Sequence, residues 1–165
     1  MSENDEVDRI VDAWHDARPD LDFAPLQVLS RVKRLAGHLE QARRASFAHA
    51  ELESWEFDVL AALRRAGGPQ ELSPKELLLQ NRVSSGTMTN RIDRLEQRGL
   101  VERRTHPGDG RGILVALTGD GLNRVDTAIT RLLDAESELL GTLSPDDVGQ
   151  LTGLLRRLSI AFDII

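Results

Sequence analysis

The sequence predicts a mainly α-helical protein with one small β-hairpin, and three observations lead to this fold class. Apolar residues recur at helical spacing through most of the 165 residues. The spacing changes to a period of two in LVERRT (100–105) and ILVALT (113–118), which the glycine-rich segment HPGDGRG joins as a hairpin. A short helix, a turn and a second helix come directly before the hairpin. This order of elements is the outline of a winged helix-turn-helix, here with an extra N-terminal helix.

Three helices are predicted in the first part of the chain. The first spans about three turns before ARPDLDFAP ends it, and its apolar stripe consists of Val7, Ile10, Val11 and Trp14. The second runs to about Phe47 and turns inward Leu26, Leu29, Val32, Leu35 and Leu39. Ser54 is expected to cap the third helix, WEFDVLAALRRA, which ends at the segment GGP (67–69).

Four more helices follow, and each has a recognisable start or end. Ser73 and Glu76 form a capping box at the start of the fourth helix. The fifth buries a stripe and ends at Gly99; the stripe is Met88, Ile92 and Leu95. Thr118 caps a long helix, and Ser144 with Pro145 opens the last one. We therefore divide the chain into N-terminal helices (1–48), a winged helix-turn-helix core (49–118) and C-terminal helices (119–165).

The composition excludes several classes of function. The chain has no cysteine, so thiol chemistry and cysteine-ligated metals are excluded, and its four histidines lack ligand spacing. It has no glycine-rich phosphate loop and no nucleophile with a plausible base, so we expect neither an enzyme nor a bound cofactor or metal. The acidic start, MSENDEVDRI, lacks the order of a signal peptide, and no apolar run has the length of a membrane span. A cytoplasmic protein without a membrane partner is expected.

The uneven distribution of charge points to a nucleic-acid partner. The chain as a whole carries a net charge of -6. Residues 1–22 hold eight acids and two arginines, whereas residues 82–111 hold seven arginines and four acids. Because affinity for phosphate depends on a local patch, the second segment is a candidate nucleic-acid interface in spite of the acidic total.

The fifth helix and the hairpin supply the candidate DNA contacts. Small hydroxyls, an amide and an arginine on the exposed face of a helix suit the reading of base edges in a major groove. Arginines on the hairpin suit phosphates or the minor groove. The candidates are Ser85, Gly86, Thr87, Thr89, Asn90 and Arg94 on the helix, and Arg103, Arg104 and Arg111 on the hairpin. The alternative is a solvated surface, or a winged helix that binds a protein and not DNA.

The segments SSGTMTNRIDRLEQRGLVERR and GDGRGILVALTGDG resemble the DNA-binding core of the MarR (multiple antibiotic resistance regulator) family, over about residues 50–140. The resemblance implies a homodimeric, ligand-responsive repressor that binds double-stranded DNA at a pseudo-palindromic operator, with terminal helices at the dimer interface. One departure lies at the wing tip, which commonly carries Asp-Arg-Arg in the family and here reads Asp109-Gly110-Arg111.

The last two helices agree with dimerisation on independent grounds. Both carry broad apolar stripes, wider than a compact DNA-binding unit needs to cover itself. A second copy of the chain is the natural cover for such a surface. The alternative is packing within the chain, against the first two helices.

Four further residues are candidates for a ligand site. Asp58 lies in an otherwise apolar helix, and Arg65 follows it two turns later on the same face, with the small Ala61 and Ala62 between them. Arg91 falls near the buried stripe of the fifth helix, so it is expected to point inward, away from DNA. The structural alternative makes Trp14 a core anchor and the three charged residues an ion-pair network.

These four positions are similar to those of a urate-responsive subgroup of the MarR family. The subgroup has an N-terminal helix with a tryptophan, an aspartate and an arginine seven apart, and an arginine after TxTN; here these are Trp14, Asp58, Arg65 and Arg91. The resemblance implies that urate binds near the tryptophan and an arginine and displaces the aspartate, and that the arginine of the recognition helix passes the movement to DNA. A related member responds to tricarboxylates such as trans-aconitate, so the effector stays open between urate, another purine and a carboxylate.

Overall fold

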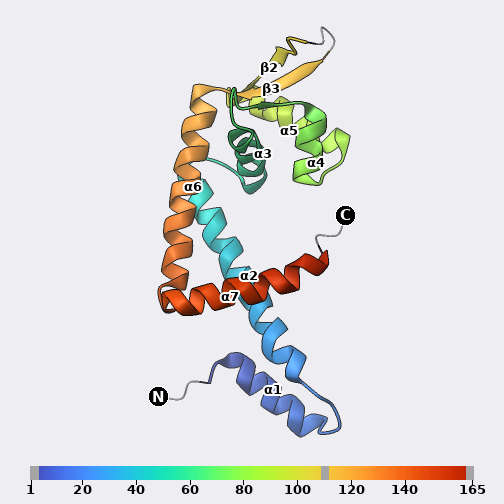
Figure 1. Cartoon of the computed structure of the whole chain (residues 1–165), viewed down its shortest axis with the longest axis vertical. Helices are drawn as coiled ribbons and strands as arrows, with labels where there is room; N and C mark the ends of the chain where they lie inside the picture. Colours follow the sequence, from blue (N-terminus) through green and yellow to red (C-terminus); the bar gives the residue numbers. More distant parts are fainter. Residues whose placement is uncertain (1–3, 109–111, 163–165) are drawn as a thin grey trace. The chain divides into compact units, whose positions relative to one another are not determined.

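The computed structural model describes residues 4–108 and 112–162, and Figure 1 shows the helices and strands that they form. The fold is mostly helical with a small antiparallel sheet, so the predicted class is confirmed. The helices are α1 (Glu6–Ala17), α2 (Ala24–His49), α3 (Ser54–Arg65), α4 (Pro74–Asn81), α5 (Ser85–Gln97), α6 (Gly119–Leu140) and α7 (Pro145–Ser159). The strands are β1 (Glu71–Leu72), β2 (Val101–Thr105) and β3 (Ile113–Leu117), and one turn of 3-10 helix (Ile160–Phe162) follows α7.

The chain divides into two compact units, residues 1–43 and 44–165, and α2 runs from the first into the second. The second unit holds both the segment predicted as the winged helix-turn-helix core and the segment predicted as the C-terminal helices. The boundaries expected at residues 48 and 118 stay a prediction.

The first unit is held together by a small apolar cluster and a group of ion pairs. Val7 and Val11 of α1 are buried with Phe23, and Leu26 of α2 packs against them. Arg31 of α2 binds the carboxylates of Asp5 and Asp8 at 2.9 and 2.8 Å. Part of the acidic N-terminal segment is therefore neutralised by α2, on the side where α1 packs.

The sheet has the strand order β1-β3-β2, and both pairings are antiparallel. The predicted hairpin is confirmed as β2 and β3, with Val101 opposite Leu117 and Thr105 opposite Ile113. The third strand, β1, was not expected, because a strand of two residues is too short to show any periodicity. It pairs Glu71 with Ala116 and so connects the start of α4 to the hairpin.

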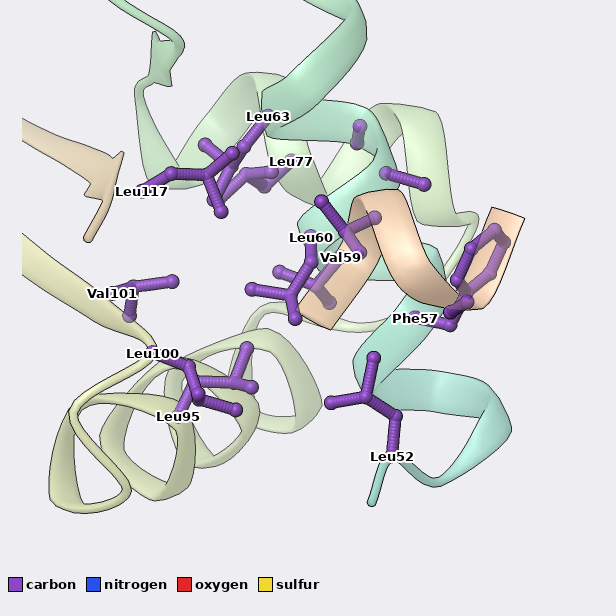
Figure 2. Packing of buried hydrophobic residues seen from close by; sticks show 14 of the residues in the cluster. Leu52, Phe57, Val59, Leu60, Leu63, Leu77, Leu95, Leu100, Val101 and Leu117 are labelled. Atoms are coloured by element: carbon purple, nitrogen blue, oxygen red, sulfur yellow. The ribbon is translucent and has the colours of Figure 1, made fainter. Parts of the chain in front are cut away.

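The core of the second unit forms where α3, α4, α5 and the hairpin meet. Leu60 and Leu63 of α3 are fully buried, as are Leu77 of α4 and Leu95 of α5. Figure 2 shows these side chains converging with those of Leu100, Val101 and Leu117. Each buried leucine contributes about 1.5–3 kcal/mol to folding, so α5 is anchored by its apolar face.

The helix starts follow the predicted caps with one exception. The hydroxyls of Ser73, Thr118 and Ser144 accept backbone N–H bonds at the starts of α4, α6 and α7, as predicted. At α3 the expectation was wrong, because the N-cap is Glu53 and Ser54 is the first helical residue. The carboxylate of Glu56 accepts the backbone N–H of Glu53 at 2.9 Å, which gives a reciprocal cap without a small hydroxyl residue.

The first turn of α6 sits directly against the segment between α5 and β2. The Thr118 hydroxyl donates to the carbonyl of Gly99 at 2.7 Å, and its backbone N–H donates to the carbonyl of Leu100. Gly121 follows so closely that a Cβ there would lie 2.0 Å from the Leu100 carbonyl oxygen. Only glycine permits this approach.

The C-terminal helix α7 differs from the others of the second unit, because none of its residues is buried. Its leucines at 151, 154, 155 and 158 are between 37% and 55% exposed. Among the residues that the structure describes, no helix combines the length and apolarity needed to cross a membrane.

Candidate nucleic-acid interface

Helix α5 presents a polar face to solvent because its apolar face is fixed in the core. Met88, Ile92 and Leu95 are buried. The six helix residues predicted to contact DNA all lie on the exposed remainder, and they are Ser85, Gly86, Thr87, Thr89, Asn90 and Arg94. The periodicity of the sequence was sufficient to separate the two faces.

Two hydroxyl groups on this face are held by local bonds. The Thr87 hydroxyl lies 2.8 Å from that of Ser84, the N-cap of α5, and the Thr89 hydroxyl donates to the Ser85 carbonyl at 3.0 Å. A hydroxyl that donates to the backbone keeps its lone pairs free to accept. The Thr89 oxygen is therefore suited to accept a bond from a base donor such as the amino group of cytosine or adenine.

A hollow of about 410 Å³ opens beside the first turns of α5. It is lined by Trp55, Gly86, Thr87, Asn90, Arg91 and Arg94. The guanidinium carbon of Arg94 lies 4.8 Å from the centre of the Trp55 ring, and that of Arg91 lies 5.5 Å away. Arg91 is thus half-buried and turned toward α3, while it also lines the hollow among the candidate DNA contacts.

Glu53 joins Trp55 to Arg94. The indole N–H of Trp55 donates to one carboxylate oxygen of Glu53 at 2.6 Å, and Arg94 donates to the other oxygen at 3.4 Å. Neither Trp55 nor Glu53 was expected from the sequence, because both precede Arg94 by about forty residues. An aromatic residue in the first turn of a helix gives no signal of what it will contact.

The wing arginines differ in their surroundings. Arg103 binds the carboxylates of Asp93 and Glu96 on α5, and its side chain is 30% exposed. The bond to Asp93 is the main cause that raises the pKa of Arg103 above its ordinary value, against the opposing effect of burial. Arg104 is more exposed and binds Glu102 at 2.5 Å. Arg111 lies outside the described residues.

A second arginine fixes the end of α5. Arg98, its C-cap, donates to the carboxylate of Glu56 at 2.5 Å and to the backbone carbonyl of Glu51 at 2.7 Å. Glu56 is 1% exposed. The pairing compensates a buried carboxylate and joins the end of α5 to the start of α3. This pair was not expected from the sequence, where Asp58 was the acidic residue thought to need a partner in the apolar helix; in the structure Asp58 is exposed and Glu56 is the buried acid.

The predicted ligand residues fall in both units. Trp14 belongs to the first unit, where its ring stacks on Phe23 with the centroids 6.0 Å apart and 48% of the residue stays exposed. Asp58 and Arg65 are exposed on α3, whereas Ala61 and Ala62 between them are buried in the core. The alanines therefore serve core packing and do not border an open space. Among the described residues, no cluster of acids and histidines could hold a metal ion.

Comparison with known proteins gives a consistent result. A model of the MarR family matches residues 51–112. The chain is 34% identical over 152 residues to the HTH-type transcriptional regulator PecS of Dickeya dadantii. The aligned region covers 92% of each of the two proteins. It is 35% identical over 109 residues to the multiple antibiotic resistance protein MarR of Salmonella typhimurium, with 66% of this chain and 74% of that protein covered.

A solved structure agrees with these sequence relatives. The fold matches that of a mutant MarR from E. coli complexed with operator DNA, with a TM-score of 0.66 and 28% identity. The match covers 84% of this chain and 99% of that chain.

Proposed function

Because the chain belongs to the MarR family of DNA-binding transcriptional regulators, we propose that it is a homodimeric repressor whose affinity for its operator is lowered by urate or a similar small anion. The observation that carries the DNA-binding part is the exposed polar face of α5 beside a basic wing. The ligand-responsive part is supported by the order and spacing of Trp14, Asp58, Arg65 and Arg91.

The two DNA-contacting elements have different tasks in this proposal. Asn90 and Arg94 on α5 suit bidentate bonds to base edges, which carry sequence information. Arg104 and Arg111 on the wing suit phosphates, which carry affinity. Arg103 acts on DNA indirectly, because its guanidinium is engaged by Asp93 and Glu96 and so sets the position of the wing on α5.

Replacing Arg94 and Arg111 in turn tests this division. Arg94→Ala is expected to cost about 1–3 kcal/mol of operator binding and to relax sequence preference. Arg111→Ala is expected to weaken binding to all duplexes and to reduce the slope of affinity against salt. Arg18→Ala, which removes the same charge from an exposed pair in the first unit, is the control. Equal losses for both variants on unrelated duplexes would contradict the division, and binding without salt dependence would favour a protein-interaction winged helix.

The exposed leucines of α7 support the homodimer. A two-fold dimer would set one α5 of each protomer into successive major grooves, at half-sites about 10 base pairs apart. Sedimentation at micromolar concentration is expected to give a dimer, and a monomer would contradict this part of the proposal.

The proposed switch depends on charge. An anionic ligand is attracted by Arg65 and repels Asp58, and Asp58 lies three residues after Trp55, on the same side of α3 as the ring that Arg91 covers. A displacement of Asp58 would thereby reach Arg91 and shift α5 relative to a groove of fixed spacing. The coupling required is about 1–3 kcal/mol, or roughly 5- to 150-fold in DNA affinity.

Titration of the protein–DNA complex with urate and with trans-aconitate tests the switch and identifies the class of anion. Asp58→Asn removes the charge that the ligand repels, so it should blunt the release of DNA even where ligand still binds. Trp14→Phe and Arg65→Ala should instead weaken ligand binding. Asp126→Asn, which also removes a partly exposed carboxylate from the second unit, is the matched control. A wild-type response in Asp58→Asn would rule out the mechanism and leave the DNA-binding assignment intact.

A further inference from the structure

We propose that Trp55 is a positioning residue for DNA recognition, and that its ring, held by Glu53 and also contacted by Arg91, fixes Arg94 in the orientation from which it meets DNA. The inference rests on the proposed function of α5. It adds a residue outside the helix-turn-helix that determines specificity without contacting a base.

Trp55 is itself firmly placed. It lies in the first turn of α3 and is partly buried against the main core cluster of the second unit. Its indole N–H is bound by Glu53 at 2.6 Å. An aromatic side chain has few rotatable bonds, so core packing together with this bond leaves the ring little freedom to turn.

Both arginines lie within the distance at which a cation is attracted to an aromatic face, which is about 6 Å from the ring centre. The separations are 4.8 Å for Arg94 and 5.5 Å for Arg91. Arg94 is also drawn to Glu53, whose carboxylate therefore binds the ring and the arginine together. The guanidinium of Arg94 is held by a ring on one side and by a carboxylate at one edge.

This arrangement prepares Arg94 for binding. An exposed arginine samples many rotamers and loses this freedom when it binds a base. Because the Trp55 ring and Glu53 already restrict the rotamers of Arg94 in the free protein, less conformational entropy is lost when Arg94 binds DNA. Because Trp55, Arg91 and Arg94 line one hollow with Asn90 and Thr87, the fixed guanidinium groups remain next to the other side chains predicted to read DNA.

Glu53 has a second effect, through its charge. A carboxylate beside Arg94 repels phosphate, so it opposes binding to duplexes in which Arg94 finds no base partner. Arg94 can leave Glu53 because both side chains are more than half exposed and the N–O separation is 3.4 Å. The aromatic ring favours the productive orientation, and the carboxylate disfavours indiscriminate binding.

The test measures sequence discrimination, which a loss of stability alone does not change. The probes are a duplex of about 30 base pairs that the wild-type protein selects from a randomised pool, and a duplex of equal composition in shuffled order. Trp55→Leu keeps an apolar side chain against the core and removes the aromatic face. Its affinity for the selected duplex is expected to fall about 5- to 30-fold, the effect of losing two such contacts, with a much smaller change for the shuffled one. Trp55→Phe keeps a ring and should recover part of the loss.

Two controls separate positioning from structure. Leu122→Ala also truncates a residue partly buried against the same cluster, on α6, and should lower the melting temperature without changing discrimination. In an Arg94→Ala background, Trp55→Leu should have a clearly smaller effect than in the wild type, because the two residues act together. The inference would be overturned if Trp55→Leu discriminated between the two duplexes as the wild type does, or if its loss of affinity and that of Arg94→Ala were fully additive. Neither result would contradict the proposed DNA binding. If the wild-type protein selects no sequence at all, both the inference and the proposed DNA binding fail.

Discussion

Helices α5 and α7 are both amphipathic and of similar length, 13 and 15 residues, yet only α5 has buried residues on its apolar face. The face of α5 is buried by α3, α4 and the hairpin, and Leu95 has no exposed surface. The face of α7 stays open, and Leu158 is 52% exposed. A periodic pattern therefore shows that a face needs cover but not whether the same chain provides it.

The largest expected effect concerns the closed face. Leu95→Ala removes a fully buried side chain from the point where α5 meets the core, and it should lower the free energy of unfolding by about 2–5 kcal/mol. Because the lost contacts lie within the chain, the difference from wild type should be the same at all protein concentrations. Chemical denaturation at two concentrations measures it; a difference that depends on concentration would show that the core extends across an interface.

The next effect concerns the open face. Leu158→Glu places a charge on α7 where we propose that a second copy packs, and it should weaken the dimer by about 1–3 kcal/mol, seen as dissociation during sedimentation. Leu79→Glu alters a leucine of α4 that is 64% exposed and serves as the control. If both variants stayed dimeric to the same extent, the proposal that a second copy covers the apolar face of α7 would be contradicted.

A smaller effect tests the polar side of α5. Arg103→Ala removes the ion pairs from β2 to Asp93 and Glu96, and it should weaken operator binding by about 1 kcal/mol through misplacement of the wing. Its salt dependence should remain that of wild type, whereas Arg111→Ala should reduce the slope by about 0.9. A reduced slope for Arg103→Ala would mean that Arg103 contacts phosphate directly. Asp93→Asn should reproduce the effect of Arg103→Ala in part.

The smallest effect concerns the capping box at the start of α4. A capping box of the same type begins α7. The hydroxyl and backbone N–H of Ser73 donate to the Glu76 carboxylate and hold its pKa below the ordinary value. Glu76→Ala should cost about 0.5–1 kcal/mol at neutral pH. The carboxylate must be ionised in the folded state for this contribution, so the difference from wild type should persist above about pH 4.3 and vanish as the pH falls through the lowered folded pKa. Denaturation as a function of pH measures it, and a constant difference in acid would exclude the ionised cap.

The sequence predicted the elements of the fold well where a local rule decides them. The Ser73, Thr118 and Ser144 caps and the period of two in the hairpin were all confirmed. Ser54 as the cap of α3 was wrong, because a long acidic residue can take that place when Glu56 completes the reciprocal bond. Strand β1 was missed because its existence depends on pairing with β3 and on no pattern of its own.

For the candidate site, the sequence predicted which side chains of α5 are exposed but not which residues their arginines contact. Exposure on α5 follows from the burial of Met88, Ile92 and Leu95, so the six helix candidates are exposed as expected. The partners of the arginines come from distant segments: Arg94 meets Trp55 and Arg98 meets Glu56. Such pairs are fixed by tertiary packing, which spacing along one chain does not encode.

The contact between Gly121 and Leu100 has a mechanical consequence. The start of α6 touches backbone at the end of the α5 segment, with the Thr118 bonds beside it and no flexible side chain between the two. A layer of side chains would absorb small displacements by changing rotamers, but two backbones in direct contact have no such slack. We therefore expect a tilt of α6 about its first turn to displace Gly99 and Leu100, and with them the end of α5. The missing Cβ at Gly121 thus couples the position of α6 to that of α5.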